Sequence, residues 1–134
     1  MARIIYAEDD ELVGELVQTT LIEAGHAVGV VKNGRDALQL VRQRRPDLLI
    51  LDISMPEMTG SQVLDLIRID ETLYDLPILM LTGRRGQIDE NIAIKAGATD
   101  YLRKPFDPDR LVVTVQALLS KAKRPEPGPA FRRI

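Results

Sequence analysis

The stretch Leu48-Leu49-Ile50-Leu51-Asp52 is a run of aliphatic residues that ends abruptly on a carboxylate. A second apolar run, Ile4-Ile5-Tyr6-Ala7, ends in the same way on the pair Glu8-Asp9. Short runs of this kind are typical of buried parallel strands, and if these two are neighbours, their three carboxylates meet at one edge of the sheet. Unit charges about 4 Å apart repel by roughly 4 kcal/mol at a protein surface, so the crevice must bind a cation or keep a proton.

Strands and helices alternate along the rest of the chain. Further β-rich runs occur at Ala27–Val31, Ile78–Leu81 and Tyr101–Leu102, and a helix-length segment follows each strand. This alternation predicts βαβ units. We therefore expect an α/β fold with a doubly wound, five-stranded parallel sheet and helices on both of its faces.

The expected helices carry their own start and stop signals. Polar caps precede them, glycine or proline follows them, and each has one apolar stripe that we expect to face the sheet. The caps are Asp9 or Asp10, Asn33, Thr59 with Gln62, and Asp107 before Pro108; the stops are Gly25, Pro46 and Gly97. The stripe of the first helix is Leu12, Leu16, Val17, Leu21 and Ala24, and that of the fourth is Ile88, Ile92, Ala93 and Ala96.

Length and composition limit the other possibilities. The 134 residues, 45% of them hydrophobic, suit one domain over residues 1–123, followed by a Pro-rich tail or linker at 124–134. A net charge of -2 gives no field that would attract nucleic acid or an anionic membrane. The chain has no cysteine and no apolar stretch near the roughly 18 residues of a membrane span, so we expect a cytoplasmic protein.

Two more polar residues, Thr82 and Lys104, follow the fourth and fifth strands, at the edge where open α/β sheets bind ligands. A carboxylate at this edge can attack phosphorus if the charge of the phosphoryl group is screened. A divalent cation held by Asp9 and Asp52, with Glu8 acting through water, would provide that screening. The ammonium of Lys104 and the hydroxyl of Thr82 would bind phosphoryl oxygens. Hard oxygen ligands and a phosphoryl substrate favour Mg2+ over zinc or copper.

Each of these residues also has an ordinary explanation when it is taken alone. An aspartate after a strand is more often a turn former or helix cap, and the acidic run at 8–11 is equally consistent with a helix N-terminus. Lys104 alone fits a surface lysine. Asp52 is different, because its helix begins only near Thr59, too far along for Asp52 to cap it. The coincidence of polar residues at several strand ends of one edge is what favours a site.

Together these residues resemble the receiver domain of bacterial two-component response regulators, from Arg3 to about Lys123. The matching pieces are Glu8-Asp9, Leu51-Asp52-Ile53-Ser54-Met55-Pro56 with Thr59-Gly60, Leu81-Thr82-Gly83, Lys95-Ala96-Gly97-Ala98, and Asp100-Tyr101-Leu102-Arg103-Lys104-Pro105-Phe106. The resemblance implies a flavodoxin-like (βα)5 fold with the strand order 2-1-3-4-5.

The same resemblance implies how the site works. Asp52 would accept a phosphoryl group from a sensor histidine kinase or a histidine phosphotransfer protein, assisted by Lys104 and Thr82. Mg2+ would be bound by Asp9, Asp52 and the backbone carbonyl of Ser54. The Lys104-Pro105 peptide bond would be cis. The chain would assist its own phosphorylation and dephosphorylation without being an enzyme that acts on other molecules.

A conformational switch is also implied by the resemblance. The phosphate adds roughly one and a half to two negative charges at neutral pH and draws Thr82 toward it, while Tyr101 swings inward. Taken alone, Tyr101 fits a half-buried strand aromatic. The face of the fourth helix, fifth strand and fifth helix would then contact an unidentified output partner or form a phosphorylation-dependent dimer. Ser54 and Arg84 occupy the positions that tune the lifetime of the phosphoryl group.

Three other classes of protein share some of these features. A haloacid dehalogenase-type phosphatase needs a second aspartate two residues after the nucleophile, where this chain has Ser54, and the chain is too short for the usual cap domain. A flavin-binding module needs a phosphate-cradling loop after the first strand, where Glu8-Asp9 would repel the phosphate. A pseudo-receiver that is never phosphorylated is the third, and the full set of matching residues argues against it.

Overall fold

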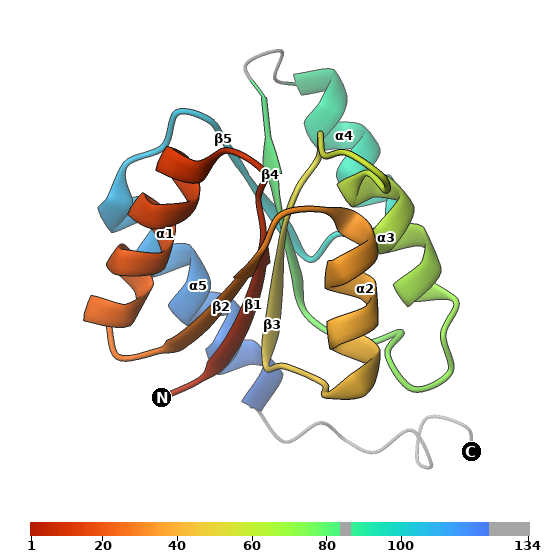
Figure 1. Cartoon of the computed structure of the whole chain (residues 1–134), viewed down its shortest axis with the longest axis horizontal. Coiled ribbons are helices and arrows are strands. Elements are labelled where there is room, and N and C mark those ends of the chain that lie inside the picture. Colours follow the sequence, from red (N-terminus) through yellow and green to blue (C-terminus); the bar gives the residue numbers. More distant parts are fainter. Residues whose placement is uncertain (84–86, 124–134) are drawn as a thin grey trace.

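The computed structural model describes residues 1–83 and 87–123, and the sheet in this part of the chain is entirely parallel (Figure 1). Its strand order is β2-β1-β3-β4-β5, which confirms the predicted doubly wound α/β fold. Arg84 and the tail at 124–134 lie outside the described residues. The strands are β1 (Arg3–Ala7), β2 (Ala27–Val31), β3 (Leu48–Asp52), β4 (Ile78–Thr82) and β5 (Asp100–Arg103).

The helices form a layer on each face of the sheet (Figure 1). The helices α1 and α5 pack on one face, and α2, α3 and α4 pack on the other. Among the described residues, no helix has both the length and the apolar character needed to cross a membrane. The helices are α1 (Glu11–Glu23), α2 (Gly34–Gln43), α3 (Gly60–Arg68), α4 (Gln87–Ala96) and α5 (Pro108–Lys123).

The alternation of side chains along the strands builds two cores. On β1, Ile4 and Tyr6 join the core under α1 and α5, whereas Ile5 and Ala7 join the core under α2, α3 and α4. The central strand β3 contributes to both cores, and all of its residues are buried. This burial on two faces explains why its sequence is an unbroken aliphatic run that ends at a polar residue.

The predicted helix caps are confirmed, and they show which of the neighbouring residues Asp9 and Asp10 caps α1. The side chain of Asp10 caps α1, because its Oδ1 accepts the backbone N–H groups of Leu12 at 3.0 Å and Val13 at 3.1 Å. Asp9 is therefore not used as the cap. Asn33 caps α2, Thr59 and Gln62 form the capping box of α3, and Gly25 and Gly97 take the left-handed backbone conformation after α1 and α4.

The predicted apolar stripes of α1 and α4 were partly wrong. Leu12 and Leu16 are 79% and 51% exposed, and Ile92 is 56% exposed. The helix α1 is apolar on more than one side, and it turns Val17 and Leu21 toward the sheet. Leu16 lies about 100° around the helix from Val17, on the side that faces solvent. Ile88, also predicted to lie in the apolar stripe of α4, has a side chain outside the described part of the structure.

Candidate functional site

Three carboxylates converge at the carboxyl edge of β1 and β3, as the strand ends predicted. The two strands are hydrogen-bonded neighbours, with Ala7 opposite Leu51, so the residues that follow lie side by side. One carboxylate oxygen from each of Glu8, Asp9 and Asp52 lies within 4.8 Å of the other two. Glu8 is 1% exposed and Asp52 is 8% exposed, whereas Asp9 faces solvent. The cluster is thus buried on one side and open on the other.

A lysine from the opposite end of the sequence completes the cluster. The Lys104 Nζ atom donates to Glu8 Oε1 at 3.0 Å and to Glu8 Oε2 at 3.3 Å, and it lies 3.4 Å from Asp52 Oδ2. The Lys104 backbone N–H donates to the Thr82 carbonyl at 2.8 Å, and the Lys104-Pro105 peptide bond is cis. The crevice that required a cation therefore contains one from the protein itself.

Burial and neighbouring charges together shift the pKa values of Asp52 and Lys104. Burial raises the pKa of Asp52 from its ordinary value of 3.8 to about 7, and a hydrogen bond and the charge of Glu8 act in the same direction, against the effect of Lys104. Burial alone would lower the pKa of Lys104, but its hydrogen bond to Glu8 and the charge of Asp52 outweigh burial and raise that pKa. The charged form of Lys104 is therefore favoured, whereas the ionised form of Asp52 is disfavoured and would be stabilised by a further positive charge.

The donor set fits a hard divalent cation. The converging ligand atoms of Glu8, Asp9 and Asp52 are all carboxylate oxygens, which Mg2+ prefers, and the exposed side of Asp9 leaves room for water in an octahedral shell. Ser54 lies in the exposed loop directly after β3, on the same edge of the sheet. These residues could hold Mg2+ without a nitrogen or sulfur ligand.

Two glycines hold the loop that follows Asp52. The Gly60 N–H donates to the Ile53 carbonyl at 2.9 Å, and a Cβ atom at Gly60 would overlap the Asp52 carbonyl. A Cβ atom at Gly34 would likewise overlap the Met58 carbonyl. The loop is thus packed against the first residues of α2 and α3, where a side chain would displace it. Sequence analysis assigned no role to this packing of Gly34.

The two residues predicted to form the switch lie in neighbouring strands. Thr82 is fully buried at the end of β4, and its hydroxyl donates to the Leu102 carbonyl of β5 at 3.4 Å. Tyr101 of β5 is partly buried against the core under α2, α3 and α4. The hydroxyl of Thr82 therefore has a partner on β5 in this structure, and a contact with Asp52 stays a prediction.

Tyr6 is a site residue that sequence analysis missed. Its hydroxyl donates to Glu8 Oε1 at 2.6 Å, and its side chain is fully buried. A signal was available, because Tyr6 is the one polar-tipped residue in the otherwise aliphatic run Ile4–Ala7 and lies two positions before Glu8, so that the two side chains point to the same side.

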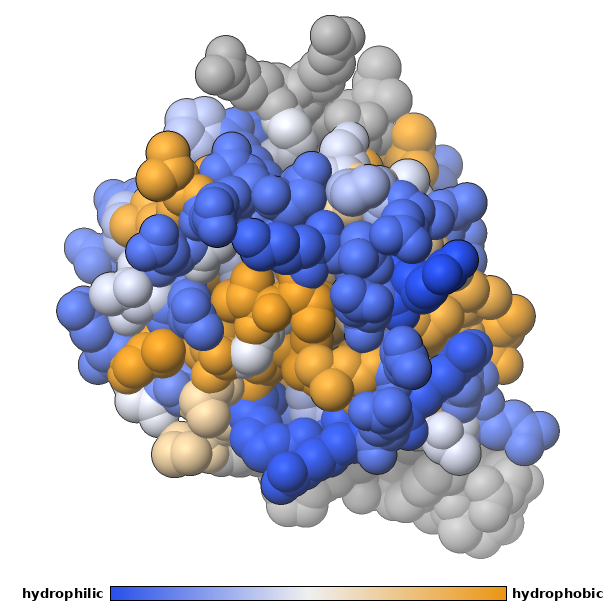
Figure 2. All heavy atoms as spheres, in the orientation of Figure 1, coloured by the Kyte–Doolittle hydropathy of each residue, from blue (hydrophilic) through white to orange (hydrophobic). Residues whose placement is uncertain are grey.

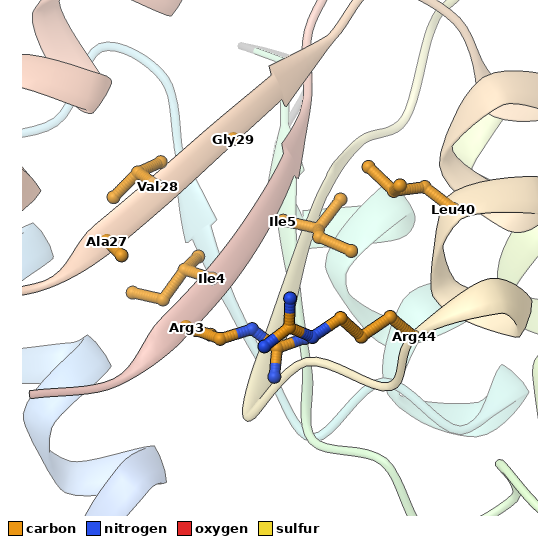
Figure 3. Close-up of a pocket in the computed structure, with 8 residues that line it drawn as sticks. All are labelled: Arg3, Ile4, Ile5, Ala27, Val28, Gly29, Leu40 and Arg44. Atoms are coloured by element: carbon orange, nitrogen blue, oxygen red, sulfur yellow. The ribbon is translucent and has the colours of Figure 1, made fainter.

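A separate hollow lies at the opposite end of the sheet. It measures about 370 Å³ and lies over β1 and β2 beside α2, where Figure 2 shows apolar side chains between hydrophilic rims. Figure 3 shows Arg3, the first residue of β1, and Arg44, just after α2, among the residues that line it. It is lined by Arg3, Ile4, Ile5, Ala27, Val28, Gly29, Leu40 and Arg44, which include no carboxylate or hydroxyl for the chemistry of the acidic cluster.

Comparison with known proteins identifies the family. The family model of the response regulator receiver domain matches residues 4–116. The chain is 39% identical to the DNA-binding dual master transcriptional regulator RpaA of Synechocystis sp. over 125 residues, covering 92% of this chain and 52% of the relative. It is 38% identical to the DNA-binding response regulator MtrA of Mycolicibacterium smegmatis, covering 96% of this chain and 54% of the relative. The chain thus spans about half the length of these relatives.

Solved structures show the same likeness. A putative response regulator from Chloroflexus aurantiacus superposes with a TM-score of 0.86 at 34% identity, covering 89% of this chain and 98% of that one. The chemotaxis response regulator CheY4 of Vibrio cholerae superposes with a TM-score of 0.82 at 34% identity, covering 88% and 98%. The chain belongs to the receiver domain family of two-component response regulators.

Proposed function

We propose that Asp52 accepts a phosphoryl group from a sensor histidine kinase or a histidine phosphotransfer protein, in a Mg2+-dependent reaction in the cytoplasm. The observation that carries this proposal is the arrangement around Asp52. A buried carboxylate lies 3.4 Å from the ammonium of Lys104, beside two further carboxylates that could hold a cation. Such a site has positive charge beside the nucleophile, together with carboxylates that could hold a metal ion.

In the proposed reaction, a carboxylate oxygen of Asp52 attacks the phosphorus of the donor. The bond from phosphorus to the donor nitrogen breaks, and the electron pair leaves with the nitrogen, which takes up a proton. Glu8, Asp9 and Asp52 would hold Mg2+, whose positive charge would screen the phosphoryl oxygens. Lys104 turns from Glu8 and Asp52 toward a phosphoryl oxygen and holds it by a charge-assisted hydrogen bond.

The new charge on Asp52 would then compete for the Thr82 hydroxyl. Its present hydrogen bond to the Leu102 carbonyl is long, at 3.4 Å, and therefore weak. A nearby phosphoryl oxygen would be a stronger acceptor because it carries negative charge. Movement of Thr82 would free space beside Tyr101 of β5. The helices of the proposed output face carry exposed apolar residues, Ile92 and Ile94 of α4 and Val113 of α5, which suit contact with a partner protein.

The phosphodonor protein would approach over α1. A groove of about 360 Å³ lies beside the acidic cluster, and the exposed Leu16 and the ring of Phe106 contribute to its lining together with Lys104. An apolar groove next to the reactive lysine could position a phosphohistidine against Asp52. Leu16→Asp should slow transfer from a phosphorylated histidine protein. Ile22→Asp, at an equally exposed position near the far end of α1, is the matched control.

Phosphorylation can be tested without a protein donor. Incubation with phosphoramidate and Mg2+ should add one phosphoryl group, measured by intact mass spectrometry, and Asp52→Asn or removal of Mg2+ by EDTA should prevent it. An adduct of unchanged yield in Asp52→Asn would exclude Asp52 as the acceptor. A wild-type chain that binds Mg2+ but acquires no adduct would instead support the pseudo-receiver hypothesis.

A further inference from the structure

The hydroxyl of Tyr6 is a buried polar group that contacts the acidic cluster through Glu8. The Tyr6 ring belongs to the core under α1 and α5, and no part of its side chain reaches solvent. A phenol in such a place requires a hydrogen-bond partner, and its partner is Glu8 Oε1 at 2.6 Å, a short bond of the charge-assisted kind. A valine or isoleucine would fill a buried strand position without needing any such partner.

Glu8 is held by donors of two different kinds. The Lys104 Nζ atom contacts both of its carboxylate oxygens and also lies near Asp52, so this donor is shared. The Tyr6 hydroxyl and the Asp10 backbone N–H, at 3.3 Å from Glu8 Oε2, belong to fixed parts of the fold. Any movement of Lys104 away from Glu8 would leave the Tyr6 hydroxyl and the Asp10 N–H as the hydrogen-bond donors to Glu8 among the described residues.

The position of the phenol suits it to this task. Its hydroxyl donates to Glu8 Oε1 at 2.6 Å from a side chain that is fully buried. The Tyr6 ring is fixed by β1 and by the surrounding core, so its hydroxyl can orient the Glu8 carboxylate from the buried side of the cluster.

We propose that Tyr6 is a positioning residue for the acidic site, whose hydroxyl fixes the Glu8 carboxylate for Mg2+ binding and keeps it hydrogen-bonded when Lys104 turns to the phosphoryl group. The second half of this inference rests on the proposed function, whereas the first half concerns Mg2+ binding alone. Partners that orient metal-binding carboxylates typically change metal affinity by about 10-fold or more when they are removed.

A Mg2+ titration followed by calorimetry or amide NMR tests the inference on the unphosphorylated chain. Tyr6→Phe should weaken Mg2+ binding by about 10-fold, because it removes only the hydroxyl that orients Glu8. Tyr74→Phe, at a half-exposed tyrosine after α3, is the matched control and should bind Mg2+ like the wild type. An unchanged affinity in Tyr6→Phe would overturn the inference, whereas a wild type that binds no Mg2+ would overturn the proposed function instead.

A double-mutant cycle separates positioning from a general effect on the fold. If Tyr6 acts through Glu8, Tyr6→Phe should cause no further loss of Mg2+ affinity in a Glu8→Gln background. An equal loss in both backgrounds would show that the hydroxyl acts on the fold and would contradict the inference.

A measurement on the unmutated chain avoids any problem of folding. The buried Tyr6 hydroxyl proton should exchange slowly and be visible by NMR, and it should persist when Mg2+ and beryllofluoride are added. Loss of that signal on addition would mean that Tyr6 does not hold Glu8 in the activated state.

Discussion

Arg68 and Lys104 are two partly buried cations that the fold treats differently. Arg68, the last residue of α3, donates from Nε to the Gly97 carbonyl at 2.7 Å and from Nη1 to the Leu76 and Tyr74 carbonyls at 2.7 and 2.9 Å. Its Nη2 atom also donates to the Thr99 hydroxyl at 3.3 Å, so these hydrogen-bond partners are all neutral oxygens. Lys104 instead contacts the carboxylates of Glu8 and Asp52.

The two cations differ in whether another cation can bind to their hydrogen-bond acceptors. Backbone carbonyls are fixed in place and carry no net charge, so Arg68 acts as a permanent clamp that joins α3 to the start of β4 and the end of α4. Carboxylates attract a second cation, so the proposed function requires the contacts of Lys104 to be exchangeable when Mg2+ and a phosphoryl group bind. A partly buried cation would thus stabilise the fold in one place and take part in the reaction in the other.

The largest effect is expected at the exchangeable cation. Lys104→Met should slow phosphorylation by phosphoramidate by roughly 10²–10³-fold, because it removes the ammonium that would stabilise the transferring phosphoryl group. The rate is measured by intact mass spectrometry at saturating Mg2+, with the fold checked by amide NMR. A wild-type rate in this variant would show that Lys104 is only a counterion for Glu8.

At Arg68 we expect a loss of stability and no change in the phosphorylation rate. Arg68→Met should lower the free energy of unfolding by about 2–4 kcal/mol, because three carbonyls lose their donor. Urea unfolding measures this loss, and Arg35→Met, which removes an exposed arginine 3.7 Å from Glu57, should change stability by only about 0.5 kcal/mol. The phosphorylation rate of folded Arg68→Met should equal that of the wild type; a large decrease would remove the distinction between the two cations.

A smaller effect should appear in the pH dependence of stability. The pKa of Asp52 is raised in the folded, metal-free chain, so its contribution to stability is fully present below about pH 4 and is lost as the pH rises through about 7. Asp52→Asn should therefore become more stable than the wild type by on the order of 1–3 kcal/mol at about pH 8 in EDTA. Urea unfolding at several pH values measures the difference, and Mg2+ should reduce it. A difference that does not vary with pH would contradict the raised pKa.

The fold and the centre of the site could be predicted because both depend on local signals. Each buried parallel strand is an apolar run, and the point where the run stops at Asp52, Glu8 or Thr82 is the edge where ligands bind. Caps such as Thr59 with Gln62 were predictable because they act within one turn of helix.

The rest depended on contacts between residues far apart in the sequence. Arg68 reads as a basic residue near the end of a helix, and nothing local shows that it reaches Gly97, 29 residues later. The exposure of Leu12 and Leu16 was missed because a helix that is apolar on two sides does not reveal which side faces the sheet. The pairing of Lys104 with Glu8 depends on the placement of β5 and β1 around the same edge of the sheet.

The most direct test is to locate the phosphoryl group chemically. After reaction with phosphoramidate and Mg2+, borohydride reduces an aspartyl phosphate to homoserine, which peptide mass spectrometry can assign to a residue. We expect homoserine at Asp52, dependent on Mg2+. Homoserine at Asp9 or another carboxylate, or none at any position in a chain that binds Mg2+, would contradict the assignment of Asp52 as the phosphoacceptor.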